Sequence, residues 1–147
     1  MEEVVIASAV RTAIGSFQGA YKDVPAPKLA SAAVAEAVRR AGIAKDAVDE
    51  CVMGCVLPAG IGQAPARQAL IYSGLPQSVR ATTINRVCGS GLKAVMLGAQ
   101  AIACGDATVV VAGGMENMTR APFLLEKGRE GYRMGHGRVL DSLVHDG

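Results

Sequence analysis

The chain has 147 residues, enough for one domain around a single core. Half of the residues are hydrophobic, only 3% are aromatic and the net charge is +2, which excludes the basic, aromatic-bearing surface of a nucleic-acid binder. We expect neither a membrane-spanning helix, which needs a run of ~18 apolar residues, nor a secretion signal, because the chain begins with acidic residues. The predicted location is the cytoplasm.

Short apolar runs alternate with segments of helical periodicity along most of the chain. Pro27 suits the start of a helix, and Gly42, Gly74 and Gly105 are typical helix ends. The predicted elements are a strand at 4–10, a helix at 28–41, a strand at 48–57, a helix at 65–73, a strand at 81–87, a helix at 89–103 and a strand at 107–112. This βαβαβαβ order predicts an α/β fold with a mostly parallel sheet, in which strands 4–10 and 107–112 are covered on both faces.

The helix predicted at 89–103 has an apolar stripe that we expect to face the core. Its members recur at helical spacing and are Leu92, Val95, Met96, Ala99, Ile102 and Ala103. Met115 and Met118 are expected to pack beneath the segment that follows them.

The character of the sequence changes after Met118. Residues 119–147 are charged, Gly-containing and irregular, with a weak helical pattern at 139–144. We therefore predict a first domain at 1–118 and the beginning of a second at 119–147. We expect the first domain's last strand to lie beyond Gly147, so that the chain is a fragment of a longer protein.

The chain contains four cysteines, at positions 51, 55, 88 and 104. Reduced thiols are expected without a secretion signal, and a strand separates Cys51 from Cys55 by ~13 Å, too far for a disulfide. No spacing suggests a zinc site. We predict that Cys51, Cys55 and Cys104 are small buried hydrophobes.

Cys88 differs because it lies between a predicted strand and a predicted helix. Backbone N–H groups at a helix N-terminus are unpaired and carry partial positive charge, which stabilises a thiolate and can stabilise an oxyanion. Gly89 and Gly91 leave room for a substrate and allow the strained dihedrals of a sharp turn. Cys104 lies at the negative end of the same helix, where a thiolate is disfavoured. The position makes Cys88 a candidate nucleophile, with a buried structural thiol as the alternative.

The same turn also fits a dinucleotide-binding fingerprint. Gly89, Gly91 and Ala94 have the G-x-G-x-x-A spacing between a strand and a helix. The fingerprint belongs on the first strand of its unit, whereas here it follows the third predicted strand. Glu116 is only a loose candidate for the acidic residue that binds the ribose. We keep a dinucleotide-binding domain as a second hypothesis.

Four segments together resemble the N-terminal part of the thiolases, especially the acetyl-CoA acetyltransferases. They occur in the family's order and are VRTAIG at 10–15, GIGQAPARQA at 60–69, NRVCGSG at 85–91 and AGGMENM at 112–118. The resemblance implies a thiolase-like N-terminal half, the start of an inserted loop domain from residue 119 and Cys88 as the acyl-accepting nucleophile.

The resemblance also implies a reaction. Cys88 would take an acyl group from an acyl-CoA, and the carbanion of a second acetyl-CoA would attack the acyl-enzyme, or the reverse. CoA thioesters are substrates, and no metal or other cofactor is implied. The loop at 129–136 resembles the family's oligomerisation region, which implies a homo-oligomer, a dimer or a tetramer.

Two family motifs are missing from these residues. The His-bearing Gly-His-Pro and the Cys-x-Gly-Gly-Gly segment belong to the family's second half, so His136 and His145 are interpreted as surface histidines. A degradative 3-ketoacyl-CoA thiolase and a non-catalytic thiolase fragment stay open as alternatives. We expect the 147-residue chain alone to be inactive.

Overall fold

The structure, a computed structural model, describes residues 3–147, so the first two residues of the predicted domain 1–118 lie outside the description. Its centre is a parallel sheet of three strands: β1 (Glu50–Gly54), β2 (Arg80–Ile84) and β3 (Val110–Gly114). β1 lies between the other two, in the order β2-β1-β3, and pairs Gly54 with Ile84 and Gly114. The three carboxyl ends therefore meet at one edge, and the predicted α/β class with a parallel sheet is confirmed.

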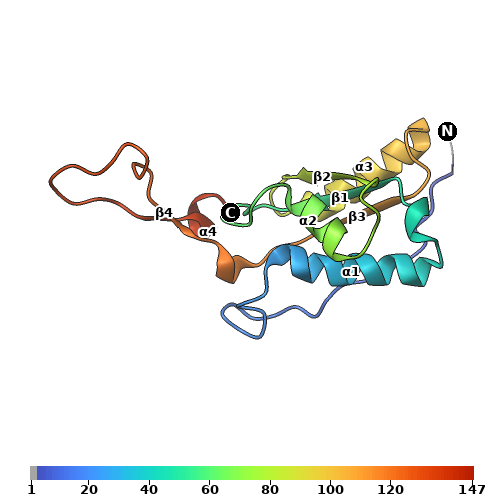
Figure 1. Cartoon of the computed structure of the whole chain (residues 1–147), viewed down its shortest axis with the longest axis horizontal. Helices are drawn as coiled ribbons and strands as arrows, with labels where there is room; N and C mark the ends of the chain where they lie inside the picture. Colours follow the sequence, from blue (N-terminus) through green and yellow to red (C-terminus); the bar gives the residue numbers. More distant parts are fainter. Residues whose placement is uncertain (1–2) are drawn as a thin grey trace.

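Helices cover both faces of this sheet (Figure 1). On one face α1 (Ala26–Ala41) and α2 (Pro65–Tyr72) pack on each other and on the strands; on the other lies α3 (Ser90–Cys104). Because side chains alternate along a strand, Cys51 and Met53 of β1 join the core beneath α1 and α2, whereas Gly54 faces α3. The core is made of small and medium aliphatic side chains, as the composition predicts.

The glycines predicted to end helices do so. Gly42 and Gly105 adopt left-handed conformations with φ of 68° and 81° at the ends of α1 and α3. Gly74, two residues after α2, has a φ of 77°. These angles are accessible to glycine without the clash that a Cβ would cause.

The predicted strand at 4–10 is not formed as a strand. Residues 3–10 lie outside every ladder of the described chain, and Val5 and Ile6 are 73% and 77% exposed. The segment is held to α1 by a hydrogen bond from Ser8 Oγ to the carbonyl of Ala37, 2.7 Å long. An apolar, β-branched composition favours a strand, but a strand also needs a neighbouring strand to pair with its backbone N–H and C=O groups. The order of helices and strands in the structure therefore begins with α1.

The strand predicted at 107–112 is β3, and helices lie on both of its faces: Val110 packs against Gly98 of α3, and Val111 packs against the core beneath α1 and α2. β3 is an edge strand whose residues are half-buried or exposed. In the described residues the strand that pairs with β3 is β1. The run of valines therefore predicted the strand correctly, and β3 stays partly exposed because one of its edges is open in the described sheet.

The predicted core face of α3 is wrong. The buried residues of α3 are the small ones, Ser90, Ala94 and Gly98, which recur every four residues and pack on the sheet. Leu92 and Met96 are 69% and 49% exposed. The backbone of α3 lies close to β3 here, because a Cβ on Gly98 would lie 3.0 Å from Val110 Cγ1. The helix therefore packs on the sheet through the face that carries its smallest side chains.

The same helix overturns the expectation that no apolar run is long enough to span a membrane. The 18-residue window Val87–Cys104 has a mean hydropathy of 1.4, which meets the length and composition of a membrane span. Core helices of soluble proteins meet the same test. Only 17% of this window is buried, and the buried residues of α3 are the small ones that pack against β1 and β3.

The last part of the chain has a different architecture. Beyond the 3₁₀ turn η2 (Met118–Arg120), β4 (Phe123–Leu124) pairs antiparallel with β5 (Leu140–Asp141), and α4 (Ser142–His145) follows where a weak helix was predicted. The residues between β4 and β5 form a long loop that projects from the rest of the molecule (Figure 1). The predicted boundary between 118 and 119 falls inside η2 and remains a prediction. A second 3₁₀ turn, η1 (Lys45–Ala47), precedes β1.

Candidate active site

Cys88 lies in the turn that joins β2 to α3. β2 ends at Ile84 and α3 begins at Ser90, so the turn is short and the thiol is exposed. This is the predicted location between a strand and a helix. The alternative of a buried structural thiol does not fit, because the side chain is open to an approaching substrate.

The backbone strain of this turn lies immediately before the cysteine. Val87 has a φ of 50°, a left-handed conformation that is rare for a β-branched residue and costs on the order of 1–3 kcal/mol. The strain was predicted at the glycines, but Gly89 has a φ of −85°. The turn is therefore strained at a valine, which would relax unless its surroundings held it.

Ser90 contributes three of the hydrogen bonds that hold the turn, two of them through its side chain. Its side chain is buried, accepts from the backbone N–H of Arg86 at 2.8 Å and donates to the carbonyl of Val87 at 2.6 Å. The backbone N–H of Ser90 also donates to the Val87 carbonyl, at 3.1 Å. A single buried serine thus fixes the turn on both sides of the strained residue.

Glycines let the turn approach the sheet. A Cβ on Gly54 would lie 2.5 Å from Ser90 Cβ and 2.7 Å from the Ser90 carbonyl carbon, closer than real Cβ atoms come. A Cβ on Gly114 would lie 3.2 Å from Gly91 Cα. The carboxyl ends of β1 and β3 therefore support the first turn of α3 directly, backbone against backbone.

The N-terminus of α3 lies directly after Cys88. In the described residues no side chain caps it, and two of its first N–H groups, those of Ser90 and Lys93, donate to the carbonyls of Val87 and Gly89. The helix has 15 residues, long enough for a dipole whose positive end lies beside Cys88. Such an end can stabilise a thiolate and the oxyanion of an attacked thioester.

Two other cysteines have the opposite environment. Cys51 and Cys55 are buried, as predicted, and burial raises the pKa of each thiol to about 12. The negative charge of Glu50 adds to the effect at Cys51, and that of Glu116 adds to it at Cys55. Both are protonated near neutral pH. Cys104 was predicted to be buried and is exposed, because it lies on the last turn of α3, beyond the sheet.

The sequence patterns did not predict that Asn85 and Glu116 accept hydrogen bonds from backbone N–H groups, Asn85 from Val87 and Glu116 from the loop after β1. Glu116 accepts backbone N–H groups of Val56 at 2.8 Å and Leu57 at 3.1 Å, so its carboxylate is occupied by the loop after β1. This arrangement counts against a ribose-binding role in a dinucleotide site. The available signal was position, since polar residues that follow parallel strands meet at one edge of a sheet.

The two histidines and two methionines singled out in the sequence lie outside the turn that bears Cys88. His136 and His145 are exposed, as predicted, and neither belongs to the turn that bears Cys88. Contrary to the prediction, neither methionine packs beneath the segment that follows: Met115 is buried in the main core, and Met118 is 57% exposed.

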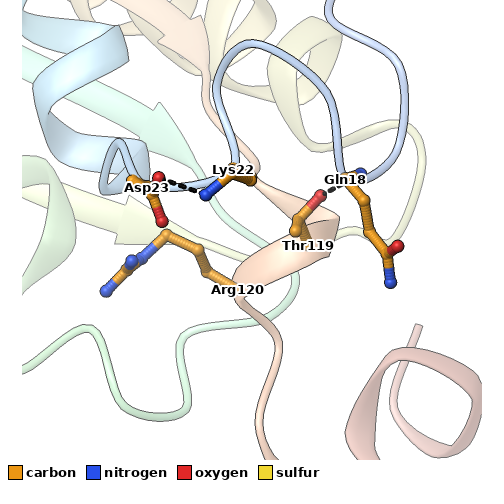
Figure 2. A pocket seen from close by; sticks show the side chains of 5 residues that line it. All are labelled: Gln18, Lys22, Asp23, Thr119 and Arg120. Atoms are coloured by element: carbon orange, nitrogen blue, oxygen red, sulfur yellow. Dashed lines mark hydrogen bonds and ion pairs between the residues drawn. The ribbon is translucent and has the colours of Figure 1, made fainter.

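A separate hollow lies where the first loop meets η2. It is lined by Gln18, Lys22, Asp23, Thr119 and Arg120. Figure 2 shows the backbone N–H of Gln18 donating to Thr119 Oγ1 at 2.9 Å and Lys22 paired with Asp23 at 2.6 Å. The turn from 85 to 90 contributes nothing to this lining, so the hollow marks a contact between two segments of the chain rather than the surroundings of Cys88.

Comparison with known proteins gives one consistent answer. The sequence matches the family described as thiolase, N-terminal domain, over residues 4–147. It is 54% identical over 147 residues to the acetyl-CoA acetyltransferase of Pseudomonas aeruginosa, covering 100% of this chain and 37% of that protein. The acetyl-CoA acetyltransferase of Escherichia coli is 55% identical over 148 residues, with 100% and 38% covered.

A solved structure agrees with the sequence matches. The Acat5 thiolase from Ascaris suum, in complex with coenzyme A, superposes with a TM-score of 0.93 at 42% identity, covering 97% of this chain and 37% of that one. The fold is thus a thiolase-type α/β fold with a cysteine exposed at a strand-to-helix turn, which confirms the predicted fold class. The chain belongs to the thiolase family. It spans about 37% of the length of these relatives.

Proposed function

We propose that this chain supplies the nucleophile of an acyl-CoA C-acyltransferase and that Cys88 is that nucleophile. The observation that carries the proposal is the exposed thiol of Cys88 at the uncapped N-terminus of α3, in a member of the thiolase family. Of the four cysteines, Cys51 and Cys55 are buried thiols, and Cys104 lies at the opposite end of the helix.

The proposed first step is an acyl transfer. The Cys88 sulfur attacks the carbonyl carbon of an acyl-CoA, a new carbon–sulfur bond forms, and the bond to the CoA sulfur breaks. The oxyanion that forms in between lies beside the positive end of the α3 dipole, which can stabilise it. CoA leaves with a proton, and the acyl group stays on Cys88 as a thioester.

The second step joins two carbons. A second acetyl-CoA loses a proton from its methyl carbon, and the carbanion attacks the acyl carbon on Cys88, which expels the cysteine thiolate. Proton removal from carbon needs a positioned base, worth typically 10²–10⁴-fold in rate. His136 and His145 are surface residues away from the turn, so the base is expected from the family's Gly-His-Pro region, and residues 1–147 alone are expected to be inactive.

Acetyl-CoA is the preferred acyl donor in this proposal. Relatives at 54% and 55% identity are named acetyl-CoA acetyltransferases, which favours condensation of two acetyl-CoA to acetoacetyl-CoA, or the reverse, over a degradative 3-ketoacyl-CoA thiolase. CoA thioesters serve as substrates without a further cofactor. A cytoplasmic homo-oligomer acting in lipid metabolism, with no nucleic-acid or membrane partner, completes the proposal.

The test substitutes Cys88 in the protein expressed over its complete reading frame. Cys88→Ser keeps the shape of the side chain but provides a much poorer nucleophile, so thiolysis of acetoacetyl-CoA is expected to fall by about 10³-fold or more. Mass spectrometry after brief exposure to acetyl-CoA should find the acetyl group on the peptide that contains residue 88. Cys104→Ser is the control and should keep turnover.

Two results would contradict the proposal. One is near-wild-type turnover in Cys88→Ser. The other is micromolar NAD binding measured by calorimetry, which would favour the dinucleotide-binding hypothesis, because the fingerprint glycines remain in both variants.

A further inference from the structure

Asn85 connects the turn that bears Cys88 to the neighbouring loop. It is the first residue after β2, and its side chain makes two hydrogen bonds in opposite directions. The Oδ1 atom accepts from the backbone N–H of Val87 at 2.9 Å, and the Nδ2 atom donates to the carbonyl of Val56 at 3.3 Å. One side chain therefore joins the strained residue before the nucleophile to the loop that follows β1.

The loop at Val56 is itself held from the third strand. The backbone N–H of Val56 donates to Glu116 Oε2 at 2.8 Å, and that of Leu57 donates to Oε1 at 3.1 Å. The Cys55 thiol also donates to Oε1, at 3.6 Å. Glu116 follows β3, so one series of hydrogen bonds links the ends of all three strands and terminates at the N–H of Val87.

Val87 is the residue that needs such support. Its φ of 50° is left-handed, and its two backbone polar groups are both bound: the N–H by Asn85 and the carbonyl by buried Ser90. If the acceptor from Asn85 were removed, the Arg86–Val87 peptide would lose the hydrogen bond to its N–H, and Ser90 alone would oppose the relaxation of Val87 toward an ordinary negative φ. That relaxation would turn the Cys88 side chain away from its present direction beside the helix N-terminus.

We propose that Asn85 is a positioning residue for Cys88: by accepting the N–H of Val87, while anchored to the loop that Glu116 holds, it aims the thiol at the incoming thioester. The proposal rests on the proposed function of Cys88 as nucleophile. Asn85 itself does not touch the reacting atoms in this arrangement. Its effect is therefore expected in the acylation step, where direction matters, more than in substrate binding.

The test compares two substitutions of Asn85 in the protein expressed over its complete reading frame. Asn85→Leu is similar in shape and removes both hydrogen bonds. Asn85→Asp keeps an acceptor for the N–H of Val87, since Asp forms the same local turn, but loses the donor to Val56. Asn117→Leu is the matched control, because Asn117 Nδ2 donates to the carbonyls of Tyr21 and Val24 at 2.7 and 2.8 Å, in a different loop.

Three quantities are measured: the single-turnover rate of Cys88 acylation by acetyl-CoA, kcat and KM for thiolysis, and amide hydrogen exchange at Val87. Asn85→Leu is expected to slow acylation and kcat by about 10- to 100-fold, as a displaced reacting atom does, with KM changed less than about threefold. Exchange at Val87 should quicken by about tenfold or more. Asn85→Asp should acylate within about fivefold of wild type, and Asn117→Leu should lower stability without slowing acylation.

The proposal is overturned if Asn85→Leu acylates at the wild-type rate, if Asn85→Asp is as slow as Asn85→Leu, or if Asn117→Leu slows acylation equally. The last outcome would mean that general loosening explains the effect. If the wild-type protein is not acylated at Cys88, the proposed function fails instead. Exchange at Val87 then still decides whether Asn85 holds the turn, because that readout needs no activity.

Discussion

Cys55 and Cys88 follow two paired parallel strands at the same edge of one sheet, yet their thiols have opposite environments. Cys55 comes directly after β1 and is buried, with its pKa raised to about 12 mainly by that burial. Cys88 comes four residues after the end of β2 and is exposed beside a helix N-terminus. The residue type and the sheet edge are shared, so the difference arises from the path of the chain after each strand.

The two paths differ in where the chain goes next. After β1 the chain enters a loop, and Glu116 accepts hydrogen bonds from the backbone N–H groups of Val56 and Leu57 and from the Cys55 thiol. After β2 the chain turns sharply at Val87 and enters α3, and Cys88, in this turn, is exposed to solvent. The strained turn that a buried serine holds thus leaves Cys88 exposed, whereas the loop that Glu116 holds leaves Cys55 buried.

Alkylation of the complete protein by iodoacetamide tests this comparison most directly. At pH 8 only about one Cys55 in 10⁴ is a thiolate, because its pKa is about 12, and the side chain is also covered. Cys88 is expected to react faster than Cys55 by more than about 10³-fold, measured by peptide mass spectrometry over time. In denaturant the two rates should converge. Similar rates in the folded protein would mean that the contrast between the two loops does not exist in solution.

Much of this site could be predicted from the sequence, and the reasons are local. The position of Cys88 follows from an apolar strand pattern that stops, small residues that follow and a helical pattern that ends at Gly105. Helix ends at Gly42 and Gly105 likewise depend on a conformation that glycine adopts most easily.

Other features could not be predicted, because they depend on contacts far apart in the chain. α3 is apolar on most sides, so periodicity does not reveal that Ala94 and Gly98 face the sheet while Leu92 faces outward. The hydrogen bond between Cys55 and Glu116 spans 61 residues. The segment 4–10 has strand composition, but composition does not specify a partner strand.

Gly54 offers a way to break the connection between the two loops. It directly precedes Cys55, and a Cβ there would lie 2.7 Å from backbone of Ser90, in the turn that bears Cys88. Gly54→Ala is expected to lower the free energy of unfolding by about 3 kcal/mol, because the first turn of α3 must move away from β1. Denaturant unfolding of the complete protein measures this change.

Gly113→Ala is the matched control on the paired strand. A Cβ on Gly113 would make ordinary contacts of 3.5 and 3.6 Å with the flexible end of Met53, so the loss should be under about 1 kcal/mol. Equal effects of the two substitutions would show that the close approach of α3 to β1 is not specifically required.

The smallest expected effect is a change in how stability depends on alkaline pH. Cys51, in the strand that leads to Cys55, is fully buried, and burial, with a further contribution from the charge of Glu50, raises its pKa to about 12. In the unfolded chain a cysteine has a pKa of about 8.5. Below pH 8.5 both states keep the proton and the full stability is present. Between about pH 8.5 and 12 the unfolded chain releases the proton while the folded chain keeps it, so stability is lost as pH rises.

Cys51→Ala should therefore give a shallower decline than the wild type, by about 1 kcal/mol per pH unit between pH 9.5 and 11, in denaturant unfolding of the complete protein. Val52→Ala removes buried methyl groups from the adjacent position without removing a titrating group, so its curve should shift downward and stay parallel to the wild-type curve. Parallel curves for Cys51→Ala as well would mean that the β1 thiol ionises as readily in the folded protein as in the unfolded chain. In that case the protonated state of Cys55, which is buried in the same core, would also have to be reconsidered. The difference in burial would then not be enough to explain a difference in reactivity between Cys55 and Cys88.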